Sequence, residues 1–81
     1  MSQLRAVIQR IDLVNREVAV IADGARQVVT VPSNCAVLLR GEPVKLRMLQ
    51  PGDLVKVAFY SRAGEAVART IEVEGGPATS A

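Results

Sequence analysis

Apolar and polar residues alternate along this chain in short runs separated by turn-forming residues, a pattern typical of β-strands. Over residues 4–12 the alternation holds until Ile11, which falls out of step with Ile8. We therefore predict one strand there, with a bulge near Gln9 or Arg10. Further strands are predicted at residues 17–22, 26–31, 36–40, 54–60 and 65–74. The pattern thus predicts a chain of short strands joined by tight turns.

Two of the predicted reversals carry strong turn residues. Asp23-Gly24 favours a two-residue β-hairpin turn, because both positions accept positive φ. Pro51 presets φ and Gly52 accepts the positive φ of a type II turn, directly before the next alternating strand. Turns are further predicted at residues 12–16, 41–43 and 61–64.

Residues 44–49 are the one segment where the spacing of apolar residues changes from that of a strand to that of a helix. Leu46 and Leu49 lie three positions apart, and Val44 and Met48 lie four apart. The segment is too short for an independent helix, so we expect a single helical turn that covers one end of the sheet.

Together these elements predict an all-β fold. We expect a small five- to six-stranded antiparallel barrel, OB-like first and SH3-like as the alternative, because closing the sheet removes its exposed edges. One domain over residues 1–74 accounts for all the predicted strands. Residues 75–81 contain only small and polar side chains, so we expect them to form a disordered C-terminal tail.

Composition limits how this barrel is stabilised. The chain has 81 residues, one cysteine, no histidine and no aromatic residues besides Phe59 and Tyr60. A disulfide within the chain and a Cys/His zinc site are therefore excluded, and the core is small. Apolar residues occupy both faces of the segments at 18–22, 28–29 and 36–39. We expect a partner surface, most simply another copy, to cover one outer face, unless the outward Val residues are merely good strand formers.

Membrane insertion is not expected from this sequence. Its apolar runs are far shorter than the ~20 residues that span a bilayer. The first residues lack the charged start, long apolar run and cleavage site of a secretory signal. A cytoplasmic location is the resulting expectation.

Several turn and core features follow one another between Ala6 and Val73. They are Val7 to Asp12, Arg16 to Val20, Asp23-Gly24, Gly41, Leu46, Leu49, Pro51-Gly52-Asp53, Val55 to Val57, Gly64 and Ala68 to Val73. With these features the chain resembles small bacterial OB-like barrel domains of unknown function, many of them secreted or membrane-attached. The resemblance implies the fold and leaves the function open.

The chain is also similar, more weakly, to the periplasmic copper-chaperone barrel of copper and silver efflux systems, through its Ile-Asp opening and the strand after Gly52-Asp53. That family binds Cu(I) with a His, two Met and a nearby Trp. This sequence has no His, no Trp and no second Met near Met48. Cys35 and Met48 are interpreted as core residues in preference to a soft two-ligand metal site. We expect no bound metal and no other cofactor.

Catalytic chemistry is also not expected. The missing His removes the usual base for a nucleophile, and Cys35 has no activating neighbour in sequence. Asp12, Asp23 and Asp53 fall at predicted turns, where carboxylates accept hydrogen bonds from backbone N–H groups. We therefore predict that the protein is not an enzyme.

The net charge is +2, and residues 40–70 hold six basic and three acidic side chains. Candidate contacts for nucleic acid are Lys56, Tyr60, Arg62 and Arg69, which follow one face of the last two strands. A solvated strand face is the alternative interpretation. The favoured function is a non-enzymatic structural or protein-interaction module that self-associates through an apolar strand face. The alternative is weak binding of RNA or single-stranded DNA.

Overall fold

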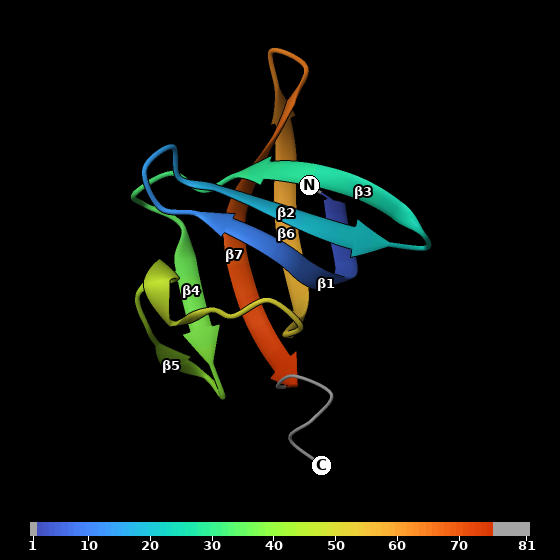
Figure 1. Cartoon of the computed structure of the whole chain (residues 1–81). Coiled ribbons are helices and arrows are strands. Elements are labelled where there is room, and N and C mark those ends of the chain that lie inside the picture. Colours follow the sequence, from blue (N-terminus) through green and yellow to red (C-terminus); the bar gives the residue numbers. More distant parts are fainter. Residues whose placement is uncertain (1, 76–81) are drawn as a thin grey trace.

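A computed structural model describes residues 2–75 of the chain, and the predicted tail lies outside these residues except for Gly75. Seven strands and one 3₁₀ turn make up the fold (Figure 1). The strands are β1 (Ser2–Asp12), β2 (Glu17–Ala22), β3 (Ala25–Thr30), β4 (Ala36–Leu39), β5 (Glu42–Pro43), β6 (Leu54–Arg62) and β7 (Glu65–Gly75), and the turn is η1 (Leu46–Met48). No helix in residues 2–75 has the length and apolar character needed to cross a membrane.

The strands form one sheet in the order β3-β2-β1-β6-β7-β4-β5, and an additional pairing of β3 with β7 closes it. Figure 1 shows β1, β2 and β3 crossing in front of β6 and β7, with β4, β5 and η1 beside one end. The predicted OB-like all-β barrel is confirmed. Two pairings, β3 with β7 and β4 with β7, are parallel, whereas the prediction was antiparallel. Parallel partners lie far apart in sequence and leave no local turn signal.

Three β-bulges bend the strands so that the barrel can close. Gln9 is the extra residue of β1, where the pairing with β2 shifts, and this confirms the predicted bulge. β7 contains two bulges that were not predicted. Ala58 and Phe59 of β6 pair with Thr70 and Ala68, so Arg69 is extra, and a second shift leaves Glu74 extra.

The interior consists almost entirely of aliphatic side chains. Its buried members are Ala6, Ile8, Val18, Val20, Val29, Val31, Val37, Leu46, Leu49, Val55, Val57, Ala68 and Ile71. Phe59 of β6 is partly buried and packs against this cluster. Leu46 and Leu49 enter it from η1 and the residue after it, which confirms the predicted covering turn. Met48 points outward instead, with 56% of its surface exposed.

Two predicted turns are shorter than expected. Residues 42–43 pair with β4 as β5, because the reversal is completed by Arg40 and Gly41, which have φ values of 54° and 80°. Likewise β6 continues through Arg62, and the turn lies at Ala63 and Gly64. Positive φ at both positions is what a two-residue hairpin turn requires, and Arg or Ala at the first position gives no sequence signal for it.

Candidate functional site

The residues considered for function lie in several surface regions, among them the outer face of β6 and β7, an exposed apolar row across β6, β1 and β2, and a hollow beside η1. The four residues predicted to contact nucleic acid lie on the first of these. Lys56 is outward on β6, between Arg5 of β1 and Glu72 of β7. Because Lys56 has the Glu72 carboxylate on one side and the Arg5 cation on the other, these three neighbouring side chains carry charges of both signs.

Tyr60 and Arg69 are the two predicted residues that the structure brings together. Both line a hollow of about 360 Å³ on the outer face of β6 and β7. Arg69 reaches it as the bulged residue of β7. Lys56 does not line this hollow, and Arg62 lies further along the hairpin, directly opposite Glu65. The predicted cluster is therefore divided into a Tyr–Arg pair and two cations with acidic neighbours.

The apolar row, which we call the outer row, consists of Leu54, Val7 and Ile21. Val7 is paired directly with Leu54 on one side and with Ile21 on the other. The residues on each side of Val7 in sequence, Ala6 and Ile8, are buried in the core, so Val7 itself faces outward. Val7 and Leu54 are 42% and 41% exposed, and Ile21 is half-buried. Three adjacent strands thus present one continuous apolar strip to solvent.

Polar contacts border the outer row on both sides. On one side the Arg26 Nε–H donates to Gln9 Oε1 at 2.8 Å, a contact that spans β2 between β3 and β1. On the other side the bulged Glu74 forms an ion pair with Arg5, with 3.1 Å between Oε1 and Nε. The sequence predicted apolar outer faces at 18–22, 28–29 and 36–39 but did not indicate the pairing of Val7 with Leu54. Only the register between β1 and β6 reveals it.

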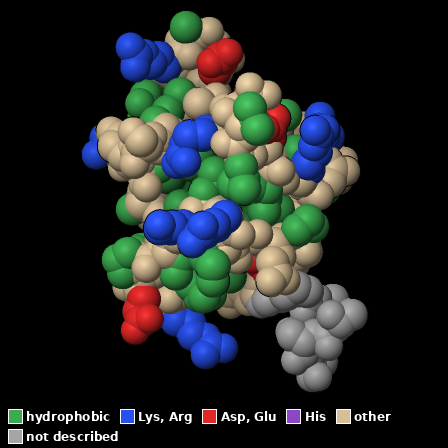
Figure 2. Space-filling view, turned by 60° about the vertical axis from the view of Figure 1, so that its left-hand side comes forward, with side chains coloured by type: hydrophobic (Ala, Val, Ile, Leu, Met, Phe, Trp, Pro, Cys, Tyr) green, Lys and Arg blue, Asp and Glu red, His purple; other side chains and the backbone are tan. Residues whose placement is uncertain are grey.

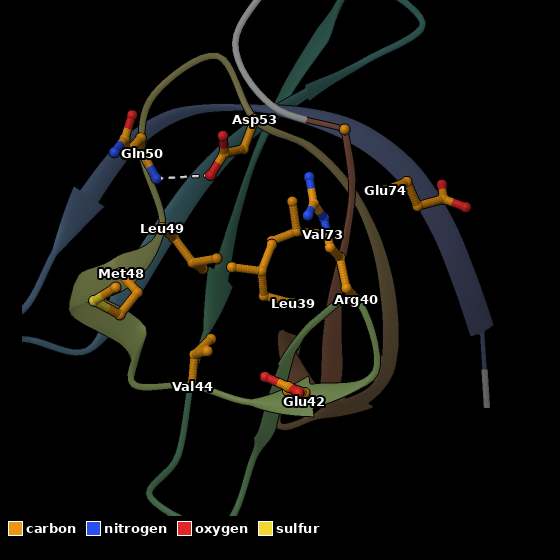
Figure 3. Close-up of a pocket in the computed structure, with 11 residues that line it drawn as sticks. Leu39, Arg40, Glu42, Val44, Met48, Leu49, Gln50, Asp53, Val73 and Glu74 are labelled. Atoms are coloured by element: carbon orange, nitrogen blue, oxygen red, sulfur yellow. Dashed lines mark hydrogen bonds between the residues drawn. The ribbon is translucent and has the colours of Figure 1, made fainter. Parts of the chain in front are cut away.

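A hollow of about 700 Å³ lies among β4, β5, the η1 turn and the end of β7 (Figure 3). Figure 3 shows Leu39 and Leu49 pointing toward one another across it, while Glu74 points away. The Asp53 carboxylate is occupied in the turn, where Oδ2 accepts a hydrogen bond from the Gln50 backbone N–H at 2.9 Å. Glu42 and Arg40 also line this hollow, so its walls combine polar and apolar side chains, and of its three carboxylates that of Asp53 is engaged in the turn and that of Glu74 points away.

Cys35 and Met48, the pair considered for a soft metal site, line different hollows. Cys35 is half-buried, and burial raises the pKa of its thiol to about 11, which keeps it protonated and weakly nucleophilic at neutral pH. Its Sγ lies 3.7 Å from the Ala36 carbonyl oxygen. Within residues 2–75 no group of three or more His, Cys, Asp or Glu side chains is arranged to hold a metal ion.

Comparison with known proteins shows the fold and no closer relationship. No protein-family model matches the chain, and none of the curated proteins matches it in sequence. The crystal structure of silver-bound CusF superposes with a TM-score of 0.72 at 16% identity, covering 90% of this chain and 96% of that one. Metal-free CusF from Escherichia coli superposes with a TM-score of 0.69, also at 16% identity, over 90% and 88% of the two chains. The likeness to copper-chaperone barrels suggested by the sequence is confirmed for the fold alone.

Proposed function

We propose that this protein is a non-enzymatic interaction module that associates with a second copy of itself through the outer row of Leu54, Val7 and Ile21. The observation that carries the proposal is the direct pairing of these three apolar residues across adjacent strands, with about two-fifths of Val7 and Leu54 exposed. A row of this kind on a small soluble barrel marks an interaction surface more often than isolated exposed Val residues do. A cytoplasmic location stays a prediction from the sequence alone.

A second copy fits this surface because the border of the outer row carries both signs of charge. Arg5, Lys56 and Arg26 lie beside it, and so do Glu72 and Glu74. A partner with a strongly acidic or strongly basic surface would meet like charges along part of this border. A copy of the same surface supplies both cations and carboxylates, so each border can meet charges of the opposite sign in an isologous contact.

The strength of the association follows from the exposed area. Burying a whole Val or Leu side chain contributes about 1.5–3 kcal/mol, so burying the exposed two-fifths contributes about 0.6–1.2 kcal/mol per residue. Val7 and Leu54 on two protomers then supply about 2–5 kcal/mol. Association itself costs about 4–15 kcal/mol in lost translational and rotational freedom, so Val7 and Leu54 offset it only together with Ile21 and the charged border of the outer row. We therefore expect a weak dimer that depends on protein concentration.

The decisive experiment measures solution mass as a function of concentration for the parent chain and two Lys variants. Val7→Lys places a charge in the centre of the outer row. Gln3→Lys is the matched control, because Gln3 is exposed on the same strand and outside the row. We expect the parent and Gln3→Lys to rise above the monomer mass of 8.6 kDa with concentration, and Val7→Lys to remain at it.

Circular dichroism establishes that each variant retains the β spectrum, and Leu54→Lys serves as a second test if Val7→Lys fails to fold. A parent chain that stays at 8.6 kDa up to millimolar concentration would contradict self-association. So would a Val7→Lys variant that is folded and still assembles like the parent.

The second proposal is weak binding of RNA or single-stranded DNA, and it is supported by Tyr60 and Arg69 lining one hollow. An aromatic ring beside a guanidinium group is a stacking platform for a base. The acidic neighbours of Lys56 and Arg62 weaken the positive field along the strand. Fluorescence anisotropy with labelled oligonucleotides at low salt tests it, and the absence of binding below about 100 µM would exclude it.

A further inference from the structure

A second opening at the end of the barrel combines cations with an apolar floor, and no part of the proposed dimer uses it. We call it the basic hollow. It has a volume of about 390 Å³, and its lining includes Leu13, Arg16, Val37, Lys45, Leu46 and Arg47. The turn between β1 and β2, the segment before β4 and the η1 turn each contribute part of it. Figure 2, which views the molecule from this side, shows Lys and Arg side chains standing among apolar surface.

The charge of the basic hollow has one sign. Arg16, Lys45 and Arg47 line it, and no acidic side chain of residues 2–75 does. Among residues 2–75 the one ion pair is that of Arg5 with Glu74, so none of the three cations is neutralised by a partner there. The Cys35 thiol, which also lines the hollow, is protonated at neutral pH and adds no negative charge.

Arg16 is held in place before any ligand arrives. Its backbone has a φ of 52°, and its side-chain Nε–H donates to the Val31 carbonyl oxygen at 2.9 Å. The backbone also joins these two segments, because the Val31 N–H donates to the Arg16 carbonyl oxygen at 2.8 Å. The Arg16 terminal amino groups are left for other partners. A fixed guanidinium loses less entropy when it binds a carboxylate than a mobile one does.

The floor and rim of the basic hollow are apolar. Val37 and Leu46 are buried and form the floor. Leu13 stands at the rim with 51% of its surface exposed, and Val14 beside it is 91% exposed. An inorganic anion would bind the cations but gain nothing from contact with this apolar surface. A ligand that matches the whole hollow has carboxylates around an apolar group.

We infer that the basic hollow binds an acidic peptide segment of a partner protein, in which one apolar side chain rests on Val37 and Leu46 and flanking carboxylates pair with the three cations. Arg16 and Arg47 are suited to bidentate contacts with carboxylates, and Lys45, which lines the same hollow, acts as a point charge. The hollow has room for one or two side chains, which limits the contact to a short motif. It shares no residue with the outer row, so peptide binding and dimerisation are separable.

The probe is a synthetic nonapeptide with a central Leu flanked by Glu residues, compared with the same peptide in which Gln replaces every Glu. Each is titrated into ¹⁵N-labelled protein at low salt, and the backbone resonances are followed by NMR. We expect the Glu peptide to shift the resonances of Arg16, Lys45, Leu46 and Arg47, with an affinity that falls as salt is added. The Gln peptide should leave these resonances unchanged.

Variants locate the contact. Arg47→Glu should weaken binding of the Glu peptide at least tenfold, the loss expected when one charge-assisted hydrogen bond is removed. Arg62→Glu is the matched control, since Arg62 lies at the end of β6 outside the hollow and makes the same change in net charge. It should leave the affinity within about twofold, apart from the small effect of net charge on long-range attraction.

Several outcomes would overturn the inference. These are an absence of shifts at the named resonances with millimolar Glu peptide, equal binding of the Gln peptide, or equal weakening by Arg47→Glu and Arg62→Glu. Tighter binding of a thymidine oligonucleotide or of phosphatidylglycerol vesicles through the same residues would assign the hollow to a nucleic acid or a lipid surface instead. None of these outcomes depends on whether the outer row forms a dimer.

Discussion

Asp53 is expected to be the most sensitive polar position of the fold. It is the one charged side chain that is buried among residues 2–75, with 6% of its surface exposed. Its Oδ2 accepts the Gln50 backbone N–H at 2.9 Å, and this contact closes the turn containing Pro51 and Gly52. The same turn is bonded to β1 twice, by the Ile8 N–H to the Asp53 carbonyl oxygen and by the Gly52 N–H to the Ile8 carbonyl oxygen. Asp53→Ala therefore removes the side-chain support of a turn that is attached beside the β1 bulge.

The loss in the free energy of unfolding follows from the hydrogen-bonding group that Asp53→Ala leaves without a partner. Asp53→Ala leaves the partly buried Gln50 N–H without its acceptor, which costs about 1–3 kcal/mol. The two main-chain bonds to β1 are unaffected by the substitution, so the loss stays in this range. For a domain of this size the free energy of unfolding is about 4–12 kcal/mol. A loss of about 2 kcal/mol corresponds to a fall in Tm of about 8–16 °C.

The assay is thermal and urea unfolding followed by circular dichroism on three variants. Asp53→Asn retains a side-chain oxygen that accepts from Gln50, so we expect it to lose about half as much stability as Asp53→Ala. Asp12→Ala is the matched control at a surface turn, where Asp12 accepts the backbone N–H groups of Val14 and Asn15. It should be the mildest of the three, because water can replace its carboxylate.

An Asp53→Ala protein whose Tm lies within about 2 °C of the parent would refute this reasoning. It would mean that water satisfies the Gln50 N–H and that the turn does not depend on the carboxylate. Equal losses for Asp53→Ala and Asp53→Asn would locate the effect in the negative charge rather than in the acceptor oxygen.

Two further measurements test the core and the buried thiol. Val57 is fully buried in β6, so Val57→Ala should lower the free energy of unfolding by about 2–3 kcal/mol, measured in urea. Val7→Ala, at the exposed outer row, should lower it by less than about 1 kcal/mol. Equal losses for the two variants would show that the interior is not closely packed. Burial raises the pKa of Cys35 from about 9 to about 11, so the unfolded state releases this proton first as pH rises. The contribution of Cys35 to stability is therefore complete below pH 9 and is lost as the pH rises through 11, and Cys35→Ala should remove that part of the alkaline loss. Thiolate absorbance near 240 nm should titrate with a midpoint near 11 in the folded protein, and a pKa near the ordinary thiol value of about 9 would contradict the burial of the thiol.

The elements whose signals are contained in a few neighbouring residues were predicted closely. The segment at 17–22 is β2 with the same bounds, and Asp23-Gly24 is its turn, with φ values of 51° and 77°. Gly52 has a φ of 97°, the positive value that the predicted type II turn requires. Leu46 and Leu49 enter the core as their spacing indicated. In each case the alternation or the turn residue determines the conformation of its own segment, so it can be recognised without knowing which distant strand pairs with it.

The candidate surfaces were predicted less completely. Tyr60 and Arg69 come together, but the bulge that places Arg69 has no signal in the sequence of β7. Lys56 was identified as an outward cation, whereas its neighbours Arg5 and Glu72 are known only from the pairing of three strands. The outer row and the basic hollow were not predicted. The hollow draws Arg16, Lys45 and Arg47 from segments that are separate in sequence.

The amino-acid sequence alone therefore determined the class of fold, most strand positions, the hairpin turns and the absence of the usual catalytic base. The fold class, strands and turns depend on backbone φ preferences and on side-chain alternation over a few residues, and the missing base follows from the absence of His in the sequence. The tertiary structure decided the parallel partners of β7, the register that aligns Leu54, Val7 and Ile21, and the convergence of cations at the end of the barrel. These depend on which distant segments pair, and that choice is set by the free energy of closing and packing the whole barrel rather than by any one segment.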